Sequence, residues 1–131
     1  MSNLTHTTAI VVIPPTEVWA PIQAIRAGHD RKIRRWMPHI TLVYPFWPVT
    51  ELKLATERIA LPCRKVAAFE VELAEFCIFR HRGGNYTVWL KPEPEAGLGE
   101  LHRRLWLALI GASPPGPQRL VVLHKCWDCH W

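Results

Sequence analysis

The sequence predicts an α+β fold, in which helices pack outside a largely antiparallel sheet. Short runs of strand-forming residues alternate with runs whose apolar residues recur three or four positions apart, the spacing of one helix face. Gly-Gly-Asn at residues 83–85 separates two strand-like runs and is typical of a hairpin. Twelve prolines divide the 131 residues into short elements. The expected order is β-α-β-α-β-β-α, followed by a short strand.

The first two elements are a strand and a helix. Residues 7–13, Thr-Thr-Ala-Ile-Val-Val-Ile, form an unbroken run that predicts a strand buried on both faces. Residues 16–27 predict a helix, with Thr16 as its N-cap and Gly28 as its stop. Its expected apolar face carries Val18, Ile22 and Ile25, flanked by Trp19.

A second helix and a long strand follow the central part of the chain. Residues 50–60 have helical spacing, with Thr50 as the cap candidate and Pro62 as the end. Residues 67–80 alternate apolar and acidic side chains, which predicts a strand with a bend or bulge near Ala74-Glu75, where the pattern changes phase.

The last elements are a return strand, a third helix and a short strand. Residues 86–90 predict the return strand of the hairpin, ended by Pro92 and Pro94. Residues 97–110 predict a helix that stops at Gly111. Residues 120–123 are expected to form a short strand.

Composition limits the class of protein. The formal net charge of +5 permits an anionic partner. No apolar run approaches the ~18–20 residues that span a membrane, and no signal peptide is visible. The four cysteines are therefore expected to be free thiols, and a cytoplasmic location is favoured, with the nucleus as an alternative. We expect a monomer with no cofactor, in which residues 1–111 form one domain and residues 112–131 its Pro-rich loop and atypical tail.

The stretch Pro-His-Ile-Thr-Leu-Val-Tyr-Pro between Pro38 and Pro45 has the strongest chemical content. As a strand it would place alternate side chains on opposite faces. The two predicted faces are His39, Thr41 and Val43 on one side and Ile40, Leu42 and Tyr44 on the other. An imidazole that transfers protons near neutral pH would thus stand beside a hydroxyl that can bind a phosphate oxygen.

Basic residues precede this strand and offer a cationic approach to it. They are Arg31, Lys32, Arg34 and Arg35. A solvated basic surface and a structural histidine are the alternatives for these two features. Tryptophans 36, 47 and 89 are either core residues or platforms for base stacking.

Residues 31–46 resemble the first signature of the two-histidine phosphoesterase superfamily, also called the 2′-5′ RNA ligase-like family. Pro-His-x-Thr-Leu followed by Tyr-Pro-Phe carries the resemblance, and residues 69–111 follow the family layout. The resemblance implies a two-lobed fold, with one His-x-Thr/Ser strand in each lobe. It also implies metal-independent general acid/base catalysis on 2′,3′-cyclic or 2′-5′ phosphodiesters of RNA or nucleotides.

The residue roles follow from this resemblance. His39 corresponds to one acid/base and Thr41 to one phosphate-binding hydroxyl. Arg34, Arg35 and Tyr44 are the expected substrate-binding residues. The expected partner is RNA, an oligonucleotide or a cyclic nucleotide, with no metal at the site.

The second signature is not intact in this chain. Residues 112–131 contain no His-x-Thr or His-x-Ser. His124 is the nearest counterpart, but Cys126 stands where a hydroxyl is expected, and a thiol is a weaker hydrogen-bond donor. The second lobe is accordingly expected to be incomplete. Two hypotheses remain, an enzyme that uses His124 and a catalytically impaired RNA- or nucleotide-binding remnant of the fold.

Two metal or cofactor patterns and a third role compete at the C-terminal end. Cys126-Trp-Asp-Cys129-His130 matches the haem-attachment pattern, but only Trp131 follows it, so haem is disfavoured. Zinc held by His124, Cys126, Cys129 and His130 is also disfavoured, because these four residues lie within seven positions. A structural or interaction domain is the third possibility, supported by the Trp-rich tail alone.

Overall fold

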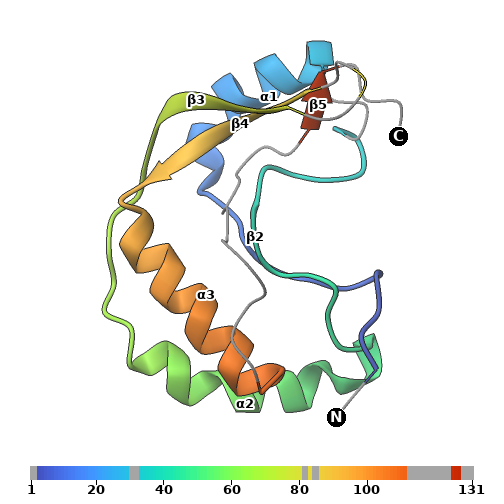
Figure 1. The fold of residues 1–131 in the computed structure, drawn as a ribbon, viewed down its shortest axis with the longest axis vertical. Coiled ribbons are helices and arrows are strands. Elements are labelled where there is room, and N and C mark those ends of the chain that lie inside the picture. The colour runs from blue at the N-terminus through green and yellow to red at the C-terminus, as the bar shows by residue number, and fades with distance from the viewer. Residues whose placement is uncertain (1–2, 30–32, 81–82, 84–85, 112–124, 128–131) are drawn as a thin grey trace. The chain divides into compact units, whose positions relative to one another are not determined.

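The computed structural model confirms the α+β class and describes residues 3–29, 33–80, 83, 86–111 and 125–127. Three α-helices and five strands are traced in this part of the chain (Figure 1). The helices are α1 (Trp19–His29), α2 (Leu52–Arg64) and α3 (Glu95–Leu109). The strands are β1 (Ile10–Val12), β2 (Ile40–Val43), β3 (Glu72–Arg80), β4 (Tyr86–Glu93) and β5 (Lys125–Trp127). They form two sheets, with strand orders β1-β2 and β3-β4-β5.

The chain divides into two compact units, and each is assembled from three separate segments. The first unit comprises Met1–Val11, Thr41–Glu72 and Glu93–Leu120. The second comprises Val12–Ile40, Leu73–Pro92 and Val121–Trp131. The sequence predicted a domain over residues 1–111 followed by a tail over residues 112–131. Apart from β5, this tail lies outside the described residues, so the boundary stays a prediction.

The first unit has its core between α2, α3 and the segment that follows β2. Its largest buried apolar side chains are Leu42, Val43, Phe46, Trp47, Leu98, Leu105 and Leu109. The indole of Trp106 on α3 donates a hydrogen bond to the Leu42 carbonyl at 3.3 Å. Thr8 donates to the Trp47 carbonyl at 2.6 Å, which fastens the N-terminal segment to the same core.

The second unit contains α1 and the three-stranded sheet. Ile22 and Arg26 on α1, together with Trp89 and Leu90 on β4, are buried there. Strand β5 pairs antiparallel with the first residues of β4, in a register that places Thr87 across from Cys126. The predicted strand over residues 120–123 lies outside the described residues, and the observed strand begins at Lys125.

Both predicted threonine caps are wrong, for the same reason. A short 3₁₀ turn opens each of the first two helical segments, at Thr16–Val18 and Val49–Glu51. Each turn begins directly after a proline, Pro15 or Pro48, so the threonine lies inside the turn and makes no capping bond. A proline supplies the fixed φ that such a start requires.

The sequence also predicted the C-terminal ends of α1 and α2 too early in the chain. Helix α1 continues through Gly28 to His29, because Gly28 does not adopt the positive φ of a glycine stop. Helix α2 runs through Pro62 to Arg64. Pro62 lies in its last turn, where the missing N–H costs one hydrogen bond and few residues remain to be disturbed. Gly111, with φ of +80°, confirms the predicted end of α3.

Three strand predictions need correction. Strand β1 is only three residues long and partly exposed, since it belongs to a two-stranded sheet, and Ile13 after it is 50% exposed. Strand β3 begins at Glu72 and runs without interruption past Ala74-Glu75. The stretch before it packs on α3 instead, where a Cβ at Gly97 would lie 2.8 Å from the Phe69 ring.

The return strand β4 extends through Pro92, which was predicted to end it. The described part of β5 pairs only with Tyr86, Thr87 and Val88, so no traced ladder bond on that side requires an N–H at position 92. Pro92 is instead among the most deeply buried residues of the chain.

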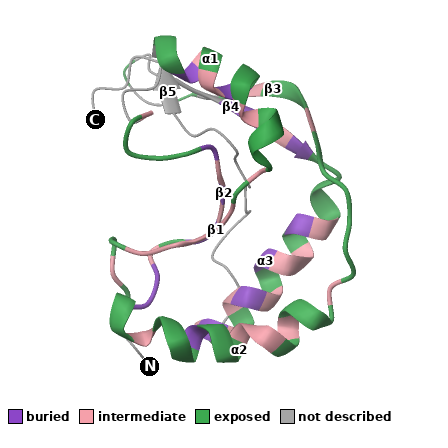
Figure 2. Ribbon diagram, turned by 180° about the vertical axis from the view of Figure 1, so that it is seen from behind, coloured by how far each residue is buried: buried purple, intermediate pink, exposed green. Residues whose placement is uncertain are grey.

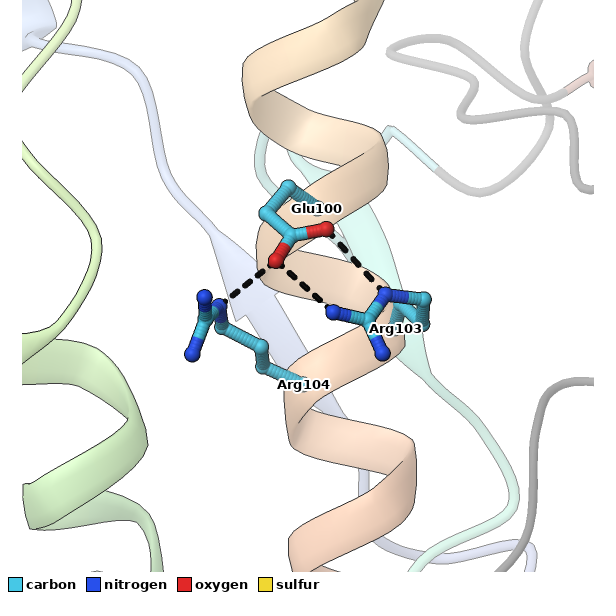
Figure 3. A network of polar contacts seen from close by, with 3 residues as sticks. All are labelled: Glu100, Arg103 and Arg104. Carbon is cyan, nitrogen blue, oxygen red and sulfur yellow. Dashed lines mark hydrogen bonds and ion pairs between the residues drawn. The ribbon is translucent and has the colours of Figure 1, made fainter.

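The exposed side of α3 carries a small network of charges (Figure 3). Glu100 accepts hydrogen bonds from Arg103 at 2.8 and 3.1 Å and from Arg104 at 2.7 Å. The hydrogen bond from Arg103 is the main cause that lowers the pKa of Glu100. Both arginines thus bond to a carboxylate on their own helix.

The core role of α3 predicts an unequal response of two leucines on one helix. Leu105 is 2% exposed and Leu107 is 41% exposed. We expect Leu105→Ala to lower the free energy of unfolding by about 2–5 kcal/mol, because it leaves a cavity. Leu107→Ala should change it by less than about 0.5 kcal/mol. Urea unfolding checks both, and equal losses would contradict the placement of α3.

The buried His102 predicts a loss of stability in mild acid. Its ring is 4% exposed and lies edge-on to Trp106, and desolvation lowers its pKa. The folded protein therefore keeps His102 neutral at a pH where the unfolded chain has already bound a proton. The free energy of unfolding should decrease as the pH falls below about 6.5. Thermal unfolding at pH 5.5 and 7.5 should show a smaller decrease for His102→Leu, and an equal decrease would contradict this assignment.

Candidate active site

The sequence prediction for the faces of β2 is correct for its first residues and wrong for its last. Ile40 and Leu42 are buried, while His39 and Thr41 are only partly buried, as alternation requires. Val43, however, is completely buried, and Tyr44 is 48% exposed. The strand ends at Val43, so the alternation does not extend to Tyr44.

The imidazole of His39 is oriented by the backbone just before it. Its Nδ1 lies 2.7 Å from the Met37 carbonyl oxygen. A carbonyl can only accept a hydrogen bond, so this contact places the proton on Nδ1. In the neutral ring Nε2 is then the basic nitrogen. The Trp36 ring lies beside the imidazole, with ring centroids 5.5 Å apart and planes inclined by 41°.

Arg26 anchors the segment that carries these two rings. Its side chain is 3% exposed and adds nothing to a cationic surface. Its guanidinium donates to the Trp36 carbonyl at 2.6 Å and to Gln23 Oε1 at 2.9 Å. Helix α1 is therefore bonded to the residue three positions before His39.

The predicted substrate-binding residues are accessible. Arg34 and Arg35 lie in a turn before Trp36 and are exposed, while Arg31 and Lys32 lie outside the described residues. Tyr44 donates its hydroxyl to the His6 carbonyl at 3.3 Å and contacts the His6 ring edge-on.

The three tryptophans separate into two kinds. Trp47 and Trp89 are buried core residues. Trp36 is 38% exposed and stands beside His39. Core packing, the favoured expectation for all three tryptophans, is correct for Trp47 and Trp89 but not for Trp36. The position of Trp36 three residues before the histidine is the one sequence signal that separates it from the other two.

The second histidine of the expected site lies outside the part of the chain that the structure describes. His124 and Cys129 are outside the described residues, as is His130, so the competing zinc and haem interpretations also fall there. Within the described ranges, no group of three or more His, Cys, Asp or Glu side chains could hold a metal ion. The same part of the chain has no helix long and apolar enough to cross a membrane.

Comparison with known proteins identifies the family. Residues 14–124 match the family model of the 2′-5′ RNA ligase superfamily. This range includes His39 and Thr41 and ends at His124. This match covers most of the chain. The chain belongs to the 2′-5′ RNA ligase superfamily. The resemblance inferred from the His-x-Thr signature is thereby confirmed, and the superfamily is that of the two-histidine phosphoesterases.

One curated relative supports the same superfamily. It is a protein of Geobacillus kaustophilus with the name "Putative phosphoesterase", 28% identical over 109 residues. The alignment covers 80% of this chain and 60% of the relative, so the chain spans about three fifths of that protein's length. No solved structure matches the chain.

The anchoring role of Arg26 predicts an effect on His39 without any substrate. Arg26→Met should lower the free energy of unfolding by about 1.5–3 kcal/mol, because the charged hydrogen bond to the Trp36 carbonyl is lost. In the folded variant we expect shifted NMR signals of the His39 ring and a changed Nδ1–H resonance. Arg58→Met, an exposed arginine on α2, is the matched control. Unchanged His39 signals in Arg26→Met would contradict the anchor.

Proposed function

We propose that the protein is a metal-independent phosphodiesterase that acts on RNA ends, with 2′,3′-cyclic or 2′-5′ phosphodiesters as substrates. The observation that carries the proposal is the hydrogen bond between His39 Nδ1 and the Met37 carbonyl. It fixes the tautomer in which Nε2 is the basic nitrogen of the neutral ring, and a general base needs a basic ring nitrogen. Membership of the superfamily supports the reaction class.

In this proposal His39 transfers one of two protons. For a 2′,3′-cyclic phosphate, a base removes a proton from the attacking water as its oxygen bonds to phosphorus. An acid gives a proton to the ribose oxygen as its bond to phosphorus breaks. His39 Nε2 is one partner in this pair, and His124 is the proposed second. The matched family range includes both histidines.

The remaining groups bind the substrate. Thr41 is the proposed hydroxyl donor to a phosphate oxygen, where charge increases in the transition state. Arg34 and Arg35 are exposed cations that would attract the phosphate backbone. Tyr44 completes the proposed binding set. The partly exposed indole of Trp36, next to His39, provides a surface on which a base can stack.

The alternative is a binding protein that has lost catalysis. The specific observation in its favour is the absence of a His-x-Thr or His-x-Ser sequence from residues 112–131. Cys126 stands two positions after His124, and its backbone pairs with that of Thr87. In this version Arg34, Arg35 and Thr41 still hold RNA or a nucleotide, but one of the two proton transfers is missing.

The first test is the His39→Ala variant. Hydrolysis of a 2′,3′-cyclic nucleotide should be abolished, whereas the activity of the unmodified chain should survive EDTA and show a bell-shaped dependence on pH. Loss of activity in EDTA with recovery on adding zinc would refute the metal-independent mechanism. Full activity of His39→Ala would refute the assigned residue.

The Thr41→Val variant separates chemistry from folding. Removing one oxyanion donor should reduce the rate of a single turnover by about 10²–10³-fold. Thr56→Val, which removes an exposed hydroxyl bonded to Leu52 on α2, is the matched control and should leave the rate unchanged. If the unmodified chain binds an RNA with a 2′,3′-cyclic phosphate end in a salt-dependent manner but does not hydrolyse it, the protein is the binding protein and not the enzyme.

A further inference from the structure

Strand β3 is an exposed apolar strand at the edge of its sheet. Its sheet has the order β3-β4-β5, so in the described part of the chain only β4 lies beside it. Every even-numbered residue of β3 is exposed, and Figure 2 shows exposure along most of the strand. Phe76 and Ile78 are 51% and 61% exposed. A long apolar edge strand without proline is a ready template for pairing with another strand.

The charges at its ends indicate what the partner is. The exposed face carries Glu72, Ala74, Phe76, Ile78 and Arg80 in sequence. Glu72 and Arg80 are each four residues from Phe76, in opposite directions. An antiparallel pair of two identical β3 strands centred on Phe76 would therefore set Glu72 of each copy opposite Arg80 of the other. Ala74 would stand opposite Ile78, and Phe76 opposite Phe76.

We propose that β3 is the dimerisation edge of this protein, and that its partner is β3 of a second copy in this antiparallel register. A two-fold axis through Phe76 relates the copies, which makes the interface self-complementary and closed. The pairing joins the two exposed apolar faces into one and adds two cross-strand ion pairs. Because the two copies associate through a single strand of each, the monomer expected from the sequence is the form at low concentration.

The charges also select the register. Sliding the strands so that Glu72 faces Ile78 would place Glu75 opposite Glu75, and like charges in that position are destabilising. Sliding them the other way would pair Glu72 with a residue beyond the end of β3 and leave Arg80 opposite Ala74. Only the register centred on Phe76 places an acidic residue opposite a basic residue at both ends of the paired strands.

Charge reversal tests the proposal. Sedimentation equilibrium of the full chain, from about 5 to 500 μM, should show a monomer–dimer equilibrium. Glu72→Arg and Arg80→Glu alone should each weaken dimerisation by about tenfold or more, since each turns two attractive pairs into two repulsive ones. The double variant E72R/R80E should restore it. Glu75→Arg, with the same charge change on the other face of the strand, is the matched control and should dimerise normally.

Each contrary result overturns the proposal. A chain that stays monomeric at every concentration has no such interface. A dimer that tolerates both single reversals uses another surface, and one that fails to recover in the double variant lacks the Glu72–Arg80 pairing. Larger assemblies would exclude a closed two-fold contact.

Cross-linking locates the axis independently of affinity. Phe76→Cys should form a disulfide between copies, because only position 76 faces itself. Ala74→Cys faces Ile78 and should not exceed the background of the natural cysteines. An equal yield from both variants would refute the register, even if the protein is dimeric.

Discussion

The geometry of the candidate site depends on one hydrogen bond, which the buried guanidinium of Arg26 donates to the carbonyl of Trp36. A buried charge is costly unless it is well bonded, so this side chain strongly favours conformations in which the Trp36 carbonyl is within reach. From there the chain has three residues before His39, and the bond between the imidazole and the Met37 carbonyl fixes the ring. The orientation of a surface histidine thus depends on a side chain in the core.

The arginines of this chain have two different roles, which the sequence alone does not distinguish: some bond to other groups of the protein, and others face solvent. Arg26 satisfies a backbone carbonyl, Arg103 and Arg104 bond to Glu100, and Arg34 and Arg35 extend into solvent. Of these five arginines, only Arg34 and Arg35 face solvent without a bond to Glu100 or to the Trp36 carbonyl. The net charge of the chain therefore overstates the charge offered to a polyanion, and the position of each side chain matters more than the total.

Local patterns predicted much of the fold because most of its determinants are local. Helical spacing identified α3, Gly111 ended it, and the signature around His39 identified both the family and the strand β2. The errors arose where tertiary contacts decide. Phe69 packs against Gly97 instead of extending β3, and Val43 is buried by the core that follows it. The orienting contacts of His39 could not be predicted, since a backbone carbonyl leaves no mark in a sequence.

The construction of each unit from three separate segments has a consequence for how the chain acquires its structure. No contiguous stretch shorter than most of the protein contains a whole unit, since each draws on the beginning, the middle and the end of its sequence. During synthesis, α1 leaves the ribosome long before β3 and β4, the strands of its own unit, exist. Folding must then close large loops before their contacts contribute, a topology of high contact order that folds slowly. Until that closure, Ile22 and Trp89 remain exposed to water and to other chains.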